Sequence, residues 1–461
     1  MRLIAVSPEK KSLTFSHSTT MNILNRKLGL LENLFEIIHD LGGMIDVNVA
    51  IIEGELTPDI LQHALDLIQK RHPMLQVHIV NAEDGNYFQS EGTPKIPLQV
   101  IDKQSENQWI EIAEEELHKK FPCGTNPLCR VTFLRNAKSN DISEIIATFH
   151  HAITDGMSCM NFLNELLSYS HKITEAENIS EIPTMKLLPP LEEMLNRNLI
   201  SPNNLEEAEQ KPLQEFPKPQ LIIETEAPPS QRRTNLVTRI FSKEMTLRLK
   251  ERCKQEQTTI HGALCAAMLL GTAKIAFKDT SLSLSCGSNV SLRKSCQPEI
   301  TPESIGCFIS IVEEIHTLEE NTTFWDLARE CKSKISKSIS LGIPIARFCN
   351  ESLQYVNEDM IIQLSHQNMG RKNTIEISNL GQFNLADKYG ELKLKELYFA
   401  TGQHWLGGSF WLGVVTFHEQ LFCSFAHVVP LVSAKTAQLL ADFFIDTVEK
   451  ACISESNHKI T

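Results

Sequence analysis

Several features that mark other protein classes are missing from this 461-residue chain. Its 12 cysteines include no Cys-x-x-Cys pair, which argues against zinc ribbons and thioredoxin-like redox motifs. It has no run of lysine and arginine and its net charge is -13, so we expect no nucleic-acid partner. Residues 1–18 lack the apolar core of a signal peptide, so export is not indicated and we expect a cytoplasmic protein.

The composition is that of a folded protein. Hydrophobic residues make up 42% of the chain and charged residues 22%, which are ordinary values for globular domains. Most cysteines lie inside apolar segments, which indicates small buried side chains in a reducing compartment. One long apolar segment, residues 260–277, contains His261 and Lys274 and follows the helix-capping residues Thr258 and Thr259. We therefore expect a buried core helix there and no transmembrane segment.

The length predicts two domains of about 200 residues each. Both halves mix helical periodicity with strand-like alternation, which predicts an α+β fold with a largely separate sheet in each half. Residues 172–233 are rich in proline and acidic residues and predict a long connection. The expected organisation is an N-terminal subdomain at 1–171, the connection at 172–233 and a C-terminal subdomain at 234–461.

Sequence periodicity places the main elements of both halves. Apolar residues at helical spacing predict helices over 25–38, 58–71, 107–120, 242–256, 323–338 and 433–452. Alternating or continuously apolar runs predict strands over 44–52, 75–80, 97–101, 131–134, 235–241, 375–379, 394–400, 410–417 and 421–426.

The most informative stretch is the pattern HHxxxDG at residues 150–156. Strand-like residues precede it and apolar residues at helical spacing follow it, so it lies on a strand-to-helix turn. Asp155 favours that turn through local hydrogen bonds, and Gly156 by tolerating a positive φ. A histidine with a carboxylate four residues later indicates a general base with local support. Given the composition of this chain, the pattern arises by chance in roughly one chain of this size in a thousand.

Two other interpretations of the motif remain open. The two histidines can be structural residues at a strand end, one buried and hydrogen-bonded and the other solvated. A metal site is the second, but adjacent histidines on a strand point to opposite faces and cannot easily converge on one ion. Because no other cluster has the spacing of zinc ligands, we expect no metal.

With this motif, the chain resembles the HHxxxDG acyltransferase superfamily, which includes chloramphenicol-acetyltransferase-like folds, peptide-synthetase condensation domains, and polyketide-associated and alcohol acyltransferases. The resemblance covers most of the chain and is closest to the polyketide-associated and condensation-domain members. The DFGWG signature of the plant branch is absent. The other matching segments, in the expected order, are Glu32, residues 54–56, 71–75, 127–130, 289–293, 305–307 and 378–381.

The resemblance implies two chloramphenicol-acetyltransferase-like subdomains, each a mixed sheet packed with helices, with a tunnel between them. It implies an acyltransferase that moves an acyl group to an acceptor hydroxyl or amine. The donor would be a thioester, either acyl-CoA or an acyl chain on a carrier-protein phosphopantetheine. It implies no permanently bound cofactor and no covalent acyl-enzyme, and we expect a monomer.

The matched positions also imply roles for residues of the motif. His151 would be the general base that deprotonates the acceptor. Asp155 would point away from the substrate and pair with Arg293. The alternative for Arg293 is a solvated position on the surface. Gly156 would keep the tunnel open for the thioester arm. His150 would be a scaffold or tunnel-lining residue, and it is also a candidate for contact with the substrate or the oxyanion.

Residues of the second half are assigned less directly. Ser378 and Asn379 are candidates for hydrogen bonds to the developing oxyanion, although Asn379 also suits a plain turn. The apolar residues that could line an acyl pocket, or simply belong to the core, are Trp405, Leu406, Phe410, Trp411 and Leu412.

Two functions other than acyl transfer fit parts of the sequence. One is a catalytically inactive relative that kept the fold as a binding or scaffold protein. The other is a thioester hydrolase with a nucleophilic serine or cysteine, and the absence of a GxSxG elbow counts against it.

Overall fold

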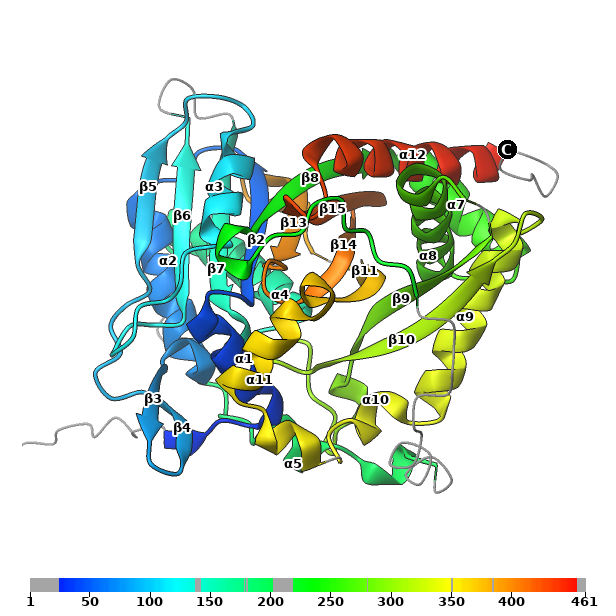
Figure 1. Ribbon diagram of the computed structural model, residues 1–461. Helices are drawn as coiled ribbons and strands as arrows, with labels where there is room; N and C mark the ends of the chain where they lie inside the picture. The colour runs from blue at the N-terminus through cyan, green and yellow to red at the C-terminus, as the bar shows by residue number, and fades with distance from the viewer. Residues whose placement is uncertain are drawn as a thin grey trace, which may run out of the picture.

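The computed structural model describes residues 25–136, 142–177, 179, 181–201, 219–279, 281–349, 351–383 and 385–453. Figure 1 shows two halves side by side, with the N-terminal elements in blue and cyan and the later elements in green to red. Each half contains a six-stranded sheet packed with helices, which confirms the predicted α+β fold. Part of the predicted connection, 202–218, lies outside the described residues.

The first sheet has the strand order β12-β13-β2-β7-β6-β5. The helices of this half are α1, α2, α3 and α4, and α2 packs against α4. The strands are β2 (Ile45–Glu53), β5 (Leu98–Asp102), β6 (Cys129–Arg135), β7 (Ile142–His150), β12 (Lys388–Tyr389) and β13 (Leu392–Thr401), and the helices are α1 (Leu30–Leu41), α2 (Pro58–Arg71), α3 (Gln108–Glu116) and α4 (Gly156–Thr174).

The second sheet has the order β10-β9-β11-β14-β15-β8. Helix α8 packs against both α9 and α12, and this layer covers a core that contains Trp325, Phe410 and Phe444. The strands are β8 (Arg233–Phe241), β9 (Leu282–Ser291), β10 (Ile309–Leu318), β11 (Arg371–Gln382), β14 (Gly407–Phe417) and β15 (Gln420–Val429), and the helices are α7 (Lys243–Gln255), α8 (Ile260–Gly271), α9 (Phe324–Ser340) and α12 (Ala434–Ile453).

The two sheets do not divide at the predicted connection. Strand β13 comes from the second half of the sequence but pairs antiparallel with β2, with Leu397 opposite Ala50. Strand β12 extends the same sheet beyond β13. The sequence predicted the strand at 394–400 but not its partner β2, because periodicity does not identify a partner strand. The boundaries 1–171, 172–233 and 234–461 stay a prediction.

The first elements of the chain differ from those predicted. Asn25–Lys27 is a short strand, β1, which joins a small sheet with β4 (Gly85–Gln89) and β3 (His78–Ala82). The helix predicted over 25–38 begins only at Leu30, where Glu32 accepts from the Gly29 backbone N–H at 2.6 Å. It ends at Gly42, whose φ of 111° is the left-handed conformation that glycine adopts readily.

The segment 260–277 is α8 followed by a π-helical turn, Thr272–Phe277. Thr259 caps it by accepting from the Gly262 backbone N–H at 3.0 Å. It is the one helix among the described residues with the length and hydropathy to cross a membrane, and 61% of that window is buried inside the protein. Its packing against α9 and α12 fits the predicted core helix.

All cysteines are free, and all but Cys123 and Cys349 are buried.

Candidate active site

A cavity of about 830 Å³ lies between the two halves, and His151 lines it. Its walls come from α1, β2 and the motif turn on one side and from β9, β10, β11, β14 and α11 (Glu358–His366) on the other. Helices α1 and α11 lie side by side near the centre of Figure 1. The lining residues Met360 and Leu364 of α11 are 41% and 45% exposed, so the cavity reaches solvent there. An opening at both faces stays a prediction.

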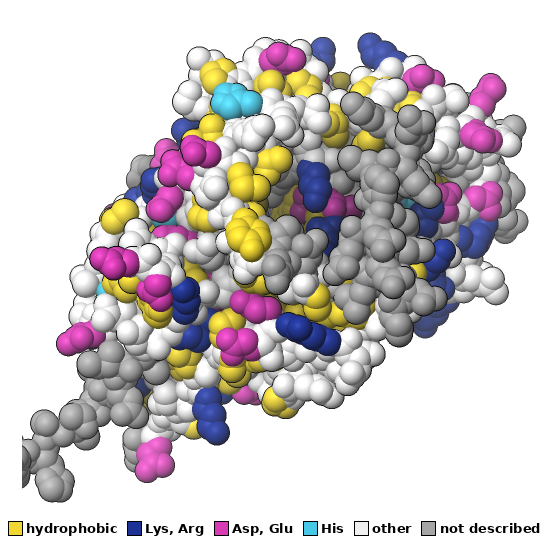
Figure 2. All heavy atoms as spheres, turned by 60° about the horizontal axis from the view of Figure 1, so that its bottom comes forward, with side chains coloured by type: hydrophobic (Ala, Val, Ile, Leu, Met, Phe, Trp, Pro, Cys, Tyr) yellow, Lys and Arg dark blue, Asp and Glu magenta, His cyan; other side chains and the backbone are white. Residues whose placement is uncertain are grey.

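The cavity has one apolar side and one polar side. Helices α1 and α11 supply most of the apolar surface, together with Leu406 and Trp411. Of the five residues considered for an acyl pocket, only these two line the cavity; Phe410 and Leu412 belong to the core of the second half. The polar side is formed by β9, β10 and β11. In Figure 2, basic and acidic side chains lie beside one another near the centre of the face shown, close to hydrophobic ones.

The structure fixes the orientation and tautomer of His151. It stands at the start of a 3₁₀ turn, His151–Ile153, directly after β7. Nδ1 lies 2.9 Å from the Thr154 carbonyl oxygen, which can only accept, so Nδ1 carries the proton. The imidazole stacks on Phe35 with a centroid distance of 4.4 Å. In the neutral ring Nε2 therefore keeps its lone pair, as a general base requires.

A second carboxylate, which the sequence analysis missed, lies beside this histidine. Asp46 Oδ2 is 3.0 Å from His151 Nδ1, and the Thr401 hydroxyl donates to Asp46 Oδ1 at 2.6 Å. Burial raises the pKa of Asp46 to about 6, although the neighbouring His151 opposes that shift. An aspartate in the mostly apolar strand β2 was the available sequence signal. It can be interpreted only once β2 is known to lie beside the motif turn.

His150 points to the other face of its strand and does not line the cavity. Its Nδ1 accepts from the Ala152 backbone N–H at 3.1 Å, and its Nε2 lies 2.8 Å from Glu36 Oε2. Burial lowers the pKa of His150 to about 3. These contacts support the scaffold role and give no support to a tunnel-lining or substrate-binding one.

Glu36, His39 and His150 bring their ligand atoms within 4.8 Å of one another, which is compatible with a metal site by distance alone. The hydrogen bonds oppose it. His39 Nε2 accepts from the Phe121 backbone N–H at 2.9 Å, and His150 Nδ1 likewise accepts a backbone proton. The remaining nitrogen of each neutral ring must then carry the proton, so it has no lone pair for an ion, whereas metal-binding histidines normally donate from the second nitrogen. This donor set does not fit a metal.

The predicted ion pair between Asp155 and Arg293 is confirmed. One guanidinium nitrogen, Nη2, lies 3.0 and 3.1 Å from the two carboxylate oxygens, and both side chains are buried. Arg293 Nη1 also donates to the carbonyl oxygens of Thr301 and Ser304. The pair therefore ties the motif turn to the segment between β9 and β10, and the alternative of a solvated Arg293 is excluded.

Asp155 also caps α4, which explains why the helix begins at the motif. Its Oδ1 accepts from the Ser158 backbone N–H at 2.7 Å and from the Ser158 hydroxyl at 2.8 Å. Oδ2 accepts from the Phe308 backbone N–H at 3.2 Å. Ser158 is a second residue that sequence analysis missed, since only the three-residue spacing typical of a helix cap points to it.

The backbone at Gly156 differs from the one predicted. Its φ is negative and it begins α4, so the turn does not need a left-handed residue. A Cβ at this position would lie 2.5 Å from Cδ2 of Leu380. Gly156 and Leu380 both line the cavity, and the glycine is needed for their close approach. Its role in keeping the tunnel open for the thioester arm stays a prediction.

Ser378 and Asn379 both line the cavity, next to Leu380 on β11. Asn379 Oδ1 accepts from the Gly381 backbone N–H at 2.9 Å, which is the turn role considered for it. Its amide nitrogen has no hydrogen bond among the described residues. The oxyanion role of these two residues stays a prediction.

Comparison with known proteins agrees with this architecture. Residues 46–386 match the family model of the condensation domain, and the chain belongs to that family. One similar protein is a linear gramicidin synthase of Brevibacillus parabrevis, which is 27% identical over 140 residues. That alignment covers 29% of this chain and 3% of the synthase, so the chain corresponds to a small part of that much longer protein.

Solved structures show the same fold at low sequence identity. The epimerization domain from the third module of tyrocidine synthetase B matches with a TM-score of 0.70 at 14% identity, covering 95% of this chain and 98% of that one. The trichothecene 15-O-acetyltransferase TRI3 of Fusarium sporotrichioides gives 0.69 at 11% identity, with 95% and 97% covered. Polyketide synthase associated protein 5 of Mycobacterium tuberculosis gives 0.62 at 14% identity, with 92% and 98% covered. The chain therefore has the predicted chloramphenicol-acetyltransferase-like fold, which it shares with these domains and transferases.

Proposed function

We propose that this chain is an acyltransferase that moves an acyl group from a thioester to an acceptor hydroxyl or, alternatively, an amine. The observation that carries the proposal is the state of His151, which lines the cavity with Nδ1 held by the Thr154 carbonyl and with Nε2 as the unprotonated nitrogen. The family match supports the same chemistry.

His151 acts as a general base in a single transfer. Its Nε2 takes the acceptor proton while the acceptor oxygen or nitrogen forms a bond to the thioester carbonyl carbon, and the carbonyl electrons move onto oxygen. When the tetrahedral intermediate collapses, the C–S bond breaks and the thiolate leaves. The imidazolium returns the proton to that sulfur, so the histidine ends the cycle neutral and no acyl-enzyme forms.

The neighbouring groups support this cycle in two ways. The Asp46 carboxylate stands 3.0 Å from Nδ1 and stabilises the positive charge that the imidazole acquires. Ser378 and the amide nitrogen of Asn379 are the proposed donors to the oxyanion, because both residues belong to the cavity wall on β11. Asp155 holds the turn through Arg293 and takes no part in proton transfer.

The donor is either acyl-CoA or an acyl chain on a carrier-protein phosphopantetheine. The similarity to part of a linear gramicidin synthase favours the carrier, whereas the structural likeness to a 15-O-acetyltransferase favours oxygen as the acceptor atom. We propose that the enzyme binds no permanent cofactor and works as a cytoplasmic monomer.

The test is an incubation of the purified protein with acyl-CoAs of several lengths, or with acylated carrier protein, and a panel of alcohols and amines. Formation of ester or amide, measured by mass spectrometry, is the expected result. Free fatty acid alone would indicate the thioester hydrolase. Binding without any product would indicate the inactive relative, which the intact His151, Asp155 and Gly156 do not favour.

A further inference from the structure

The polar side of the cavity contains a carboxylate that the transfer chemistry does not use. Glu376 lies on β11 and lines the cavity, opposite Gly287 of β9 and Trp411 of β14, and Gly408 of β14 also lies close to it. A Cβ on Gly287 would lie 3.2 Å from Glu376 Cγ, and one on Gly408 would lie 2.9 Å from Glu376 Cβ. Both neighbouring positions thus lack the side chain that would crowd Glu376 where it enters the cavity.

Glu376 has one hydrogen bond and no cationic partner within the described residues. Asn289 Nδ2, also on the cavity wall, donates to Glu376 Oε1 at 3.1 Å. Burial raises the pKa of Glu376, and the nearby cations do not compensate it. Lys372 lies 2.8 Å from Glu313 instead, and Arg371 donates to the carbonyl oxygens of Gly408 and Gln403.

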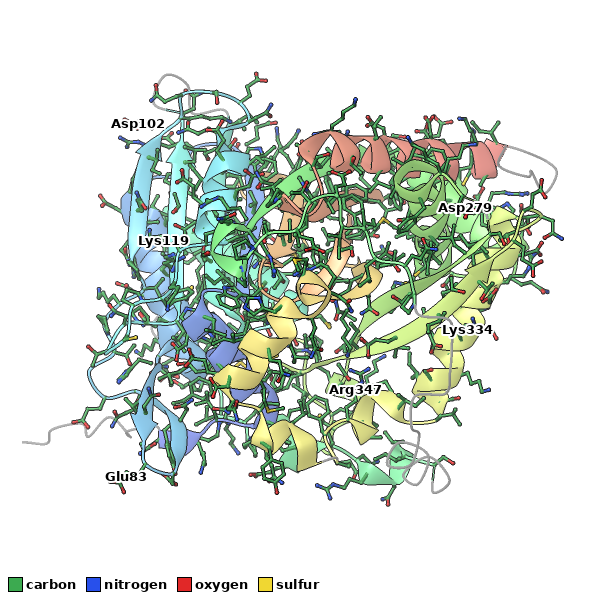
Figure 3. All side chains as sticks on the ribbon, viewed as in Figure 1. Glu83, Asp102, Lys119, Asp279, Lys334 and Arg347 are labelled. Atoms are coloured by element: carbon green, nitrogen blue, oxygen red, sulfur yellow. The ribbon has the colours of Figure 1, made fainter. Side chains whose placement is uncertain are left out.

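The neighbouring Glu313 of β10 differs from Glu376 in having cationic partners. It is paired with Lys372 and with Arg347, which is labelled in Figure 3 beyond α10 (Ile343–Ala346). These two cations hold the pKa of Glu313 below its usual value. Glu313 is therefore a satisfied structural carboxylate, whereas the second oxygen of Glu376 is available to a ligand.

The distance along β11 between Glu376 and the motif turn indicates how long a molecule must be to reach both. Leu380, four residues further along β11, reaches Gly156 at the start of α4. Extended chain advances about 3.3 Å per residue, so Glu376 lies roughly 13 Å along the strand from the side chain that contacts the motif turn. A molecule that reaches both His151 and Glu376 therefore needs two polar groups separated by an extended segment.

We propose that Glu376 and Asn289 form a subsite for a second hydrogen-bond-donating group of the acceptor, either a hydroxyl or an ammonium. This inference rests on the proposed function, since it takes the group that reacts at His151 as the first donor. The acyl chain belongs on the other side, against α1 and α11, because burial there is favourable and burial beside an uncompensated carboxylate is costly. The expected acceptor class is an amino alcohol or diol with an apolar segment between its ends.

Binding of four eight-carbon probes tests this subsite without requiring turnover. Calorimetric titration with 1-octanol, 1,8-octanediol, 8-amino-1-octanol and 8-hydroxyoctanoate changes only the far end of the molecule. We expect the diol and the amino alcohol to bind at least about tenfold more tightly than 1-octanol, the effect of a hydrogen bond to a charged group. The hydroxy acid is expected to bind most weakly, because its carboxylate meets Glu376.

The variant Glu376→Gln should reduce the preference for the amino alcohol to less than about threefold while 1-octanol affinity stays the same. Asn289→Ala, measured in parallel, should weaken the preference through loss of the orienting hydrogen bond. Glu391→Gln changes an exposed glutamate in the turn before β13 and serves as the matched control, with no change expected. Thermal melting of each variant checks that the fold is retained.

Equal affinity of the wild-type protein for 1-octanol and the two difunctional probes would overturn the subsite, as would an unchanged preference in Glu376→Gln. Turnover of the same alcohols with octanoyl-CoA and with octanoyl carrier protein separates the two proposals. Ester formation without any preference contradicts the subsite alone, and selective binding without ester formation contradicts the proposed function alone.

Discussion

The carboxylate of Asp46 and the imidazole of His151 face each other at 3.0 Å between strand β2 and the motif turn. Thr401, from the second half of the sequence, holds the other oxygen of the same carboxylate. Because Asp46 has a pKa of about 6, it is charged above that pH and protonated below it. Its support for the protonated imidazole is therefore present at neutral pH and is lost as the pH falls through about 6.

This relationship predicts a pH-dependent effect of Asp46→Asn. At pH 7.5 we expect kcat/KM to fall about tenfold, since an amide cannot stabilise the imidazolium. Below pH 6 the wild-type enzyme should approach the variant, because Asp46 is then neutral in both. The pH profile of kcat/KM is the measurement, and a constant ratio across pH 5 to 8 would show that Asp46 acts only on structure.

Replacing the base itself should have a larger effect. His151→Ala is expected to lower turnover by about two to four orders of magnitude while the protein remains folded. His150→Gln, at a position outside the cavity, is the neighbouring comparison and should affect thermal stability more than turnover. Near-normal transfer by His151→Ala would remove the proposed mechanism.

The Asp155–Arg293 pair predicts a loss of stability when either partner is removed. Both charges are buried, so Arg293→Ala or Asp155→Asn should lower the free energy of unfolding by about 3 to 5 kcal/mol. Denaturant titration measures the loss. The double variant should cost less than the sum of the single ones, because the second change no longer leaves a charge without its partner. Additive losses would mean that the two residues act independently.

Gly156 and Leu380 predict a compensating pair. Gly156→Ala should lower activity and cost about 1 to 3 kcal/mol of stability, since its Cβ would clash with the Leu380 side chain. Leu380→Ala in the same protein should remove the clash and restore part of both. The measurements are the activity and melting temperature of the single and double variants. If the double variant shows no recovery, the clash with Leu380 is not the cause of the loss in Gly156→Ala.

Two neutral histidines, one half-buried and one buried, predict destabilisation in mild acid. Burial lowers the pKa of His118 to about 4 and of His404 to about 3, and both contact Thr234 of β8. An unfolded chain binds protons at these sites from about pH 6.5 downward, whereas the folded one does not. The free energy of unfolding therefore carries no penalty from these histidines above pH 6.5, and it decreases as the pH falls from 6.5 toward 4. Buried carboxylates with raised pKa values, such as Asp46, act in the opposite direction.

The measurement is the denaturation midpoint at pH 7.5 and pH 5. The wild-type protein is expected to lose more stability between these values than His404→Gln, which has one fewer histidine to protonate. Equal losses would mean that His404 does not contribute to the acid sensitivity.

The sequence predicted most elements and the motif turn because those depend on local periodicity and capping. The helix predicted over 58–71 is α2, which Thr57 caps, and Asp155 pairs with Arg293 as the family pattern implied. Asp46 and Glu376 were missed for the same physical reason. Each is a polar residue in a buried strand, and its meaning depends on strand pairing between segments far apart in the sequence, which local patterns do not specify.

Strand β13 has a consequence for how the molecule is made. The first sheet receives residues 388–401 as its outer strands, so a ribosome must synthesise most of the chain before that sheet is complete. Until then the edge of β2 has unpaired backbone groups, which are prone to pair with other chains. The hydrogen bond from the Thr401 hydroxyl to the Asp46 carboxylate also forms only after this later segment has been made. The half that contains His151 therefore acquires its finished active site only when the later half has been made and has folded against it.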